Sequence, residues 1–318
     1  MYQLSIIVPH FNSSKMLETL LDTIPKDKDV EVIIVDDKSE KKHIEHIEKI
    51  LKEKEDHRIR FFLNDRSIKS AGTCRNIGIE NAKGKWLFFA DADDYLSDDF
   101  YEKVEPYFES TNEVVFFVPN SVYIDTKEQA NRHIIYENII HNYLMDKSLK
   151  NELYIRYKMH SPWLKIVKSE FLKTHDIKFD EVIASTDVMF STNVGYHMKH
   201  FEISKDIIYI ITRNAGSLTA NYSREVIESR AKVHIFWYRF LKERLSKEEL
   251  ELLDIEGLHL LSLSFYNSLS MLLKVFFLFR KNDLPILSRK SHRFSYILPK
   301  IYRRFLAKDF EKRYRRFN

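Results

Sequence analysis

Three carboxylates, Asp91, Asp93 and Asp94, follow directly on the apolar run at residues 86–90. Five apolar residues without a break are typical of a strand buried on both faces, as in a parallel sheet covered by helices. If the strand continues, alternation directs Asp91 and Asp93 to one side, about 6.6 Å apart. Like charges that close repel unless a cation or hydrogen-bond donors lie between them. The stretch predicts either a divalent-metal site that holds phosphate oxygens or a solvated acidic turn.

The elements around these acids alternate between strands and helices. Apolar strands are expected at 4–9, 31–37, 59–63 and 86–90, with helices after the first strand, at 41–56 and at 73–82. This alternation predicts βαβ units and a mainly parallel sheet, in which ligands bind beyond the carboxyl ends of the strands. Further strands are expected at 113–119, 161–167 and 206–213, and helices at 98–108, 169–175 and 187–198. Residues 131–158 mix helix with loop, and beyond 223 the pattern predicts long helices only.

Composition narrows the class of protein. The 318 residues are 44% hydrophobic and 31% charged, as in a globular protein with a sizeable core. With six glycines and neither a G-x-G-x-x-G nor a G-x-x-x-x-G-K sequence, a glycine-rich cofactor loop is not expected. Cys74 is the only cysteine, which excludes an intrachain disulfide and favours a reducing compartment. The first residues lead straight into a strand, so no signal peptide is expected.

Nine stretches along the chain form a recognisable series: SIIVPHFN at 5–12, IIVDDKS at 33–39, AGTCRNIGI at 71–79, AKG at 82–84, FFADADD at 88–94, WLK at 163–165, IKFD at 177–180, TDVMF at 186–190 and RNAGSL at 213–218. Taken together they resemble a bacterial family 2 glycosyltransferase with the GT-A fold. Each fragment is weak alone, but their order and spacing agree with the family over roughly the first 220 residues.

The resemblance implies a donor site. Asp91-Ala92-Asp93 corresponds to the family's D-x-D, in which Asp93 would bind Mn²⁺ or Mg²⁺ at the donor diphosphate and Asp91 would lie near the ribose. Asp37 corresponds to the carboxylate that accepts a hydrogen bond from the uracil ring, with Pro9 and Phe11 lining the base pocket. Arg75 would face the diphosphate from the start of a helix. A calcium loop starting at Asp91 is disfavoured because Leu96 stands where that loop needs glycine.

The same resemblance implies the acceptor side. Asp187 would be the catalytic base, although Thr186 replaces the acid that precedes it in the family. A structural reading of Asp187 is helix capping. Trp163 could stack on an acceptor sugar or belong to the core. His197, His200 and His234 are available as further metal ligands, but no spacing selects one of them.

The C-terminal region has a different character. From Arg280 onward, 13 Lys and Arg stand against Asp283, Asp309 and Glu311. The apolar stretch 258–279 is interrupted by His259, Asn267 and Lys274, so a packed or interfacial helix is preferred over a membrane span. Basic residues interleaved with aromatic residues at 289–317 favour peripheral contact with an anionic membrane, with oligomer formation or core packing second. Nucleic acid is not expected as a partner because no RNA-binding signature is present.

The sequence thus predicts an α/β fold of the GT-A type, Rossmann-like with a mainly parallel sheet flanked by helices, and a helical extension. Residues 1–222 would form the glycosyltransferase domain, with 1–105 binding the nucleotide-sugar and 106–222 on the acceptor side, and 223–318 the helical, basic region. The expected activity is inverting, metal-dependent transfer from a UDP-sugar to a glycan or lipid-linked glycan, on the cytoplasmic face of the plasma membrane. The alternatives are a nucleotidyl or phosphoryl transferase, or a non-catalytic membrane-bound scaffold.

Overall fold

The computed structural model describes residues 2–26, 29–213 and 223–287. The chain divides into two units, Met1–Asn221 and Tyr222–Asn318. Most of the RNAGSL stretch and the basic, aromatic sequence at 289–317 lie outside the described residues.

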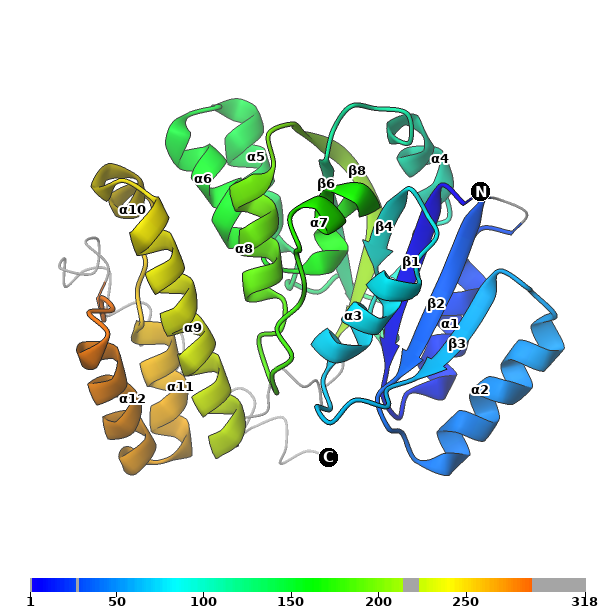
Figure 1. The fold of residues 1–318 in the computed structure, drawn as a ribbon, viewed down its shortest axis with the longest axis horizontal. Helices are drawn as coiled ribbons and strands as arrows, with labels where there is room; N and C mark the ends of the chain where they lie inside the picture. Colours follow the sequence, from blue (N-terminus) through cyan, green and yellow to red (C-terminus); the bar gives the residue numbers. More distant parts are fainter. Residues whose placement is uncertain (1, 27–28, 214–222, 288–318) are drawn as a thin grey trace. The chain divides into compact units, whose positions relative to one another are not determined.

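The first unit is built on one eight-stranded sheet (Figure 1). Its order is β3 (Ile59–Leu63), β2 (Val30–Asp36), β1 (Leu4–His10), β4 (Trp86–Phe89), β7 (Lys165–Lys168), β6 (Val114–Tyr123), β8 (Phe201–Arg213) and β5 (Tyr95–Leu96). The first four strands are parallel, β7 is antiparallel to both its neighbours, and β6 is parallel to β8. The predicted α/β class with a mainly parallel sheet flanked by helices is confirmed.

The central strands form because their sequences are apolar on both faces. Every residue of β2 and of β4 is buried, as are Leu4 to Val8 of β1. Only a strand covered by helices on both sides can bury both faces. The first unit supplies these helices as α1 (Ser14–Thr23), α2 (Lys41–Lys54), α3 (Ala71–Asn81), α4 (Phe100–Val104), α5 (Ile134–Met145), α6 (Leu149–Lys158), α7 (Ser169–Thr174) and α8 (Val188–His197). Figure 1 shows α3 lying along β1 and β2, which it contacts.

The ambiguous segment 131–158 resolves into two helices, α5 and α6, which pack against each other. Its pattern was hard to read because both helices are short and each buries only two or three side chains. Strands β6 and β8 are longer than predicted: β6 continues through Pro119 to Tyr123, and β8 begins at Phe201. Register shifts between β6 and β8 on both sides of Val118 accommodate the proline.

The second unit is helical in its described part. It contains α9 (Arg224–Arg244), α10 (Lys247–Leu253), α11 (Leu258–Asn267) and α12 (Leu269–Lys281). The apolar stretch 258–279 is two helices, because the Ser268 side chain accepts a hydrogen bond from the Met271 N–H (3.1 Å) and starts a new helix. Among the described helices, none combines the length and the apolar character that crossing a membrane requires.

Candidate functional site

The predicted donor residues gather at the carboxyl edge of β1, β2 and β4. Because these strands run parallel, with His10 paired to Asp36 and Ile7 to Phe89, their ends meet at one edge of the sheet. Pro9 and Phe11 come from the end of β1, and Asp37 comes from the end of β2. The acids at 91–94 follow β4. The topology therefore brings together residues that lie more than 80 positions apart in the sequence.

The acids after β4 form a turn, which corrects the expectation that strand alternation places Asp91 and Asp93 on one side. Strand β4 ends at Phe89, and the Asp94 N–H donates to the Asp91 carbonyl (3.1 Å). Two residues of β8 fix this turn. The Asp91 N–H donates to the Tyr209 hydroxyl (2.7 Å), and Thr212 donates from its N–H to Asp94 Oδ1 and from its hydroxyl to the Asp93 carbonyl, both at 2.6 Å.

The turn concentrates negative charge. Asp93 keeps an exposed surface, yet desolvation by the surrounding protein and then the charge of Asp91 raise its pKa. Burial and the charges of Asp93 and Asp91 raise the pKa of Asp94 well above its ordinary value. Carboxylates held this close favour either protonation or a bound cation. Asp94 already accepts the Thr212 N–H and Asp91 Oδ1 is paired with Arg75 at 2.6 Å, so the Asp93 carboxylate and the second oxygen of Asp91 are available to a ligand.

A divalent cation fits these residues when a substrate supplies the remaining ligands. Within the described ranges, no group of three or more His, Cys, Asp or Glu side chains could hold a metal ion. Mg²⁺ typically takes one or two protein carboxylates together with water and phosphate oxygens. The pair Asp91 and Asp93 meets that requirement. His200 stands just before β8, where its carbonyl accepts the Glu113 N–H at the sheet edge opposite the acids, and the His197 ring stacks on His175 with centroids 4.3 Å apart.

Residues of helix α3 contact predicted donor-site residues from both β2 and β4. Its first turn is capped by Ser70, whose hydroxyl accepts from the Thr73 N–H (3.1 Å). From the following turn, Arg75 reaches Asp91 Oδ1 at 2.6 Å and is only 6% exposed. Neighbouring Cys74 is fully buried, and burial followed by the charge of Asp37 raises its pKa, so it is a neutral thiol and not a nucleophile.

Arg75 is held in place but not saturated. Its guanidinium lies 5.2 Å from the Phe179 ring centroid and 3.4 Å from the Thr186 hydroxyl. Its Nε has no acceptor among the residues that the structure describes. A buried guanidinium with only one carboxylate partner retains donors and positive charge for an anion.

The same helix positions Asp187. Gly72 allows the loop before Asp187 to touch α3, because a Cβ there would collide with the Asp180 carbonyl and lie 2.9 Å from Thr186 Cβ. Asn76 fastens this loop, donating to the Phe179 carbonyl (3.0 Å) and accepting from the Phe179 N–H (2.9 Å). Thus three residues of α3, Gly72, Arg75 and Asn76, contact the segment that leads to Asp187.

Asp187 is the N-cap residue of α8, but its side chain makes no capping hydrogen bond. Burial raises the pKa of Asp187, the charge of Arg75 lowers it and the charge of Asp91 raises it. The carboxylate is therefore within electrostatic reach of the pair formed by Arg75 and Asp91. A carboxylate with a raised pKa and no capping hydrogen bond has the properties of a general base.

Buried polar contacts also fix the residues at the end of β2. Asp37 is 6% exposed, accepts from Asn64 Nδ2 (2.7 Å), and donates its N–H to the His10 carbonyl (2.7 Å). Asp36 pairs with His10 (2.8 Å) and accepts from the Ser39 N–H (2.9 Å), which is a structural role. Phe11 is 45% exposed, and Lys69 Nζ lies 3.3 Å from its ring centroid. Lys69 covers one face of the ring, and the part that remains exposed is available for stacking.

Comparison with known proteins places the chain in a family. The sequence profile of Glycosyl transferase family 2 matches residues 5–173, more than half of the chain. The chain belongs to glycosyl transferase family 2. The resemblance drawn from the motifs is confirmed.

Relatives and solved structures agree with this family 2 assignment. The uncharacterized glycosyltransferase EpsJ of Bacillus subtilis is 25% identical over 230 residues, covering 68% of this chain and 62% of EpsJ. The crystal structure of S. aureus TarS 1-349 in complex with UDP-GlcNAc superposes with a TM-score of 0.61 at 22% identity, covering 85% of this chain and 74% of that one. The mannosyltransferase PcManGT from Pyrobaculum calidifontis, in complex with GDP-Man and Mn²⁺, gives a TM-score of 0.56 at 15% identity, covering 88% and 75%.

At these identities the structural likeness shows the fold, and the predicted GT-A class is confirmed. The chain spans less than two thirds of the length of EpsJ, and 36% of the length of the poly(ribitol-phosphate) beta-N-acetylglucosaminyltransferase TarS.

Trp163 and Lys165, which belong to the WLK motif of this family 2 chain, are packed into the interior. Trp163 is 3% exposed and stacks on Tyr209, with centroids 5.7 Å apart, so the structure gives it a core role while its contact with an acceptor stays a prediction. Lys165 is 1% exposed and donates to the Met159 and Ser161 carbonyls and to the Ser191 hydroxyl (2.9, 3.2 and 2.9 Å). Burial lowers the pKa of Lys165 to about 7. Lys165 thereby ties the 159–161 loop to α8, a role its sequence context did not reveal.

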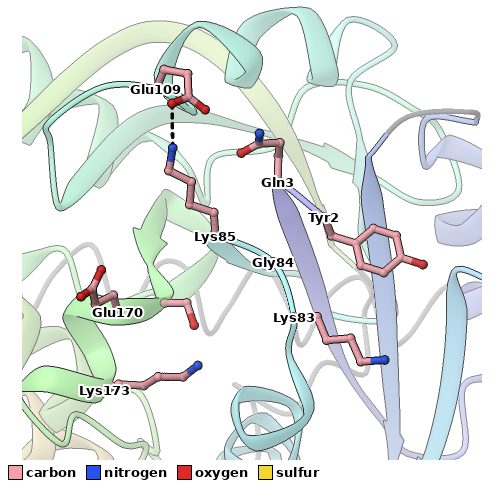
Figure 2. Close-up of a pocket in the computed structure, with 9 residues that line it drawn as sticks. Tyr2, Gln3, Lys83, Gly84, Lys85, Glu109, Glu170 and Lys173 are labelled. Carbon is pink, nitrogen blue, oxygen red and sulfur yellow. Dashed lines mark hydrogen bonds and ion pairs between the residues drawn. The ribbon is translucent and has the colours of Figure 1, made fainter.

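A cavity of about 550 Å³ lies elsewhere on this unit (Figure 2). It is lined by residues that precede β1 and β4, including Lys83 and Lys85, and by Lys173 of α7. Figure 2 shows Lys85 paired with Glu109, at 2.9 Å. Because these residues lie at the amino ends of the strands, the cavity is at the opposite edge of the sheet from the acids. None of the predicted site residues lines it.

Proposed function

We infer that this chain is an inverting, metal-dependent hexosyl- or N-acetylhexosaminyltransferase that moves a sugar from a UDP-sugar to a hydroxyl of a glycan acceptor. One observation carries the inference: a single helix, α3, touches Asp91 through Arg75, Asp37 through Cys74, and the loop before Asp187 through Gly72 and Asn76. A donor site and a base on one rigid support can hold two substrates in a reactive orientation.

Donor binding is assigned to the residues of the strand edge. Asp37 would accept the ring N–H of uracil through the oxygen that Asn64 leaves free, with Phe11 and Pro9 against the base. Arg75 would face the diphosphate with its remaining donors. The TarS complex with UDP-GlcNAc supports a nucleotide-sugar donor for this fold.

Asp93 and Asp91 would hold Mn²⁺ or Mg²⁺, which neutralises the charge that develops on the departing diphosphate. The raised pKa of Asp93, caused by desolvation and by the charge of Asp91, supports a cation there. The PcManGT structure, which contains Mn²⁺, is in keeping with such a requirement.

Asp187 is assigned the role of general base. Its carboxylate would take the proton of the acceptor hydroxyl while that oxygen attacks the anomeric carbon. The bond from the anomeric carbon to the diphosphate oxygen breaks as the new glycosidic bond forms, so the configuration at that carbon is inverted. Arg75 would stabilise the negative charge that develops on the leaving UDP, and the proton ends on Asp187.

The names of related proteins support a class of acceptor. TarS is named as a poly(ribitol-phosphate) beta-N-acetylglucosaminyltransferase and EpsJ as a glycosyltransferase, and these names support a glycan or lipid-linked glycan of cell-surface polysaccharide, teichoic-acid or lipopolysaccharide synthesis. Work on such acceptors would take place at the cytoplasmic face of the plasma membrane, with peripheral contact to anionic lipid. A homo-oligomer is compatible with this scheme.

A melting-temperature screen of UDP-, GDP- and dTDP-sugars, each with and without Mn²⁺, tests the proposal. A UDP-sugar should raise the melting temperature most when Mn²⁺ is present, and slow release of UDP should follow. Stabilisation by nucleoside triphosphates with release of pyrophosphate would favour a nucleotidyl transferase instead. No stabilisation by any nucleotide would leave the scaffold reading.

A further inference from the structure

Helix α12 carries an exposed apolar stripe, which we define as Leu269, Leu273, Phe276 and Phe277 together with Phe265 at the end of α11. Their exposed fractions are 63%, 48%, 37%, 65% and 59%. The opposite side of α12 is buried through Met271, Val275 and Phe279, on a helix that contacts α9 and α11. Figure 1 shows α9, α11 and α12 side by side (yellow to orange). Thus α12 is apolar both where it packs and where it faces outward, and a helix apolar on all sides requires a second apolar environment.

The charges that α11 and α12 themselves carry are of one sign. Residues 257–282 contain no Asp or Glu, whereas Lys274, Arg280 and Lys281 are present. Lys274 pairs with Glu228 of α9 (2.6 Å), so the cations without a carboxylate partner in the described residues are Arg280 and Lys281, in the last turn of α12. The sequence that follows, 289–318, adds 11 Lys and Arg against Asp309 and Glu311. An apolar surface on helices that carry only cations complements anionic lipid headgroups.

The exposed apolar area of the stripe is smaller than the area that a stable subunit interface buries. Taking about 200 Å² for a whole aromatic side chain, the exposed parts of these five residues amount to about 500 Å². A stable protein interface needs about 800 Å² from each partner. A bilayer requires neither a minimum area nor a complementary shape.

We propose that α12 lies flat on an anionic bilayer, with the apolar stripe at the boundary of headgroups and acyl chains and with Arg280 and Lys281 on lipid phosphates. With 13 residues, α12 is about 20 Å long and lies parallel to the surface instead of spanning the roughly 30 Å core. This assigns residues to the membrane contact in the proposed function, and its tests measure binding without any transfer of sugar.

The first test is co-sedimentation of the full chain with vesicles of phosphatidylcholine alone or mixed equally with phosphatidylglycerol. We expect binding to the anionic vesicles and at least a tenfold loss of partitioning in the double variant Leu273→Glu, Phe277→Glu. Both positions are exposed, so its melting temperature should match the wild type. Met145→Glu is the matched control, since Met145 is 75% exposed on α5 and outside the stripe. Its partitioning should be unchanged.

A second variant reports insertion directly. The three native tryptophans, Trp86, Trp163 and Trp237, are at most 3% exposed, so their emission should not respond to vesicles. In Phe277→Trp, the added indole should emit as an exposed group in buffer and shift to the blue on anionic vesicles. This variant keeps an aromatic residue at an exposed position and should fold normally.

Three results would overturn the proposal. Wild-type partitioning of the double variant would mean that the basic sequence alone binds lipid, and complete release of the wild-type chain in 1 M salt would mean the same, since an inserted apolar stripe resists screening. A dimer in solution that the double variant converts to monomers would assign the stripe to a second copy. In each case donor binding is measured in parallel, so failure of the stripe is distinguishable from failure of the transferase assignment.

Discussion

Replacement of Asp187 by asparagine tests the division of labour in the site. The side chain makes no capping bond to α8, so removing its charge should not loosen the helix. The folded-state pKa of Asp187 is raised by burial, which means that folding favours the protonated form. Its stabilising contribution is therefore full below the ordinary pKa of 3.8 and is lost as pH rises through the raised value. At neutral pH a neutral asparagine should leave the melting temperature unchanged or higher.

The same substitution should abolish most of the transfer. Loss of a positioned general base typically lowers kcat by 10²- to 10⁴-fold, so about 10²-fold is the least that we expect. UDP release in the presence of acceptor gives kcat, and calorimetric titration gives donor affinity, which should stay within about twofold because Asp187 does not contact the donor in this account. In the wild type, kcat should fall as pH drops through the raised pKa of Asp187, above the ordinary 3.8.

The matched control for Asp187 is Asp176→Asn. Asp176 is 81% exposed and pairs only with Lys178 at the surface, so its variant should show wild-type kcat and stability. If Asp187→Asn kept near-normal turnover at saturating donor and acceptor, the base would be another residue. If it lost donor binding instead, Asp187 would belong to the donor site.

Other residues give further predictions. Asp93→Asn should bind donor equally in EDTA and in Mn²⁺, whereas Mn²⁺ should tighten wild-type binding in calorimetry; metal-dependent binding in the variant would remove the metal assignment. Gly72→Ala should lower the free energy of unfolding by about 1–3 kcal/mol, because the added methyl group overpacks against Asp180. It should also lower kcat at least tenfold by displacing the loop before Asp187, and wild-type kcat would contradict this. Lys165→Met should have a free energy of unfolding in urea that is lower by about 2 kcal/mol or more, because three buried acceptors lose their donor. An unchanged urea midpoint would refute the structural role of Lys165.

The Lys165 variant also carries a pH signature. The pKa of Lys165 is about 7 in the folded protein and 10.5 ordinarily, so above pH 7 the unfolded chain binds more protons at this group. Wild-type stability should therefore gain on that of Lys165→Met as pH rises from 7 to 8.5, in paired urea titrations. A difference that stays constant with pH would mean that Lys165 is charged throughout this range.

The sequence predicts the elements whose pattern is local. Strands β1, β2 and β4 each contain an uninterrupted apolar run, and the acids that follow β2 and β4 mark the edge where the site forms. Their meeting at one edge follows from parallel pairing, which the alternation of strands and helices already indicates. The helices of 131–158 and the break at Ser268 were less accessible, because short helices and a single capping serine leave little periodic signal.

The contacts that complete the site are long-range and carry no local signal. Tyr209 and Thr212 hold the acidic turn from 118 positions away, and both lie in an apolar strand that reads as core. Gly72 is a glycine because of the Asp180 carbonyl on a distant loop, and Lys165 stands in a strand-like run. Only the folded chain shows which partner each of these residues meets.

A crystal structure of the protein grown with UDP and Mn²⁺ would test the central claim most directly, through the position of the nucleotide. We predict the uracil ring on Phe11 with its N–H on Asp37, and the diphosphate between Arg75 and a cation held by Asp93. Nucleotide bound at the opposite edge of the sheet, in the cavity lined by Lys83, Lys85 and Lys173, would contradict the account.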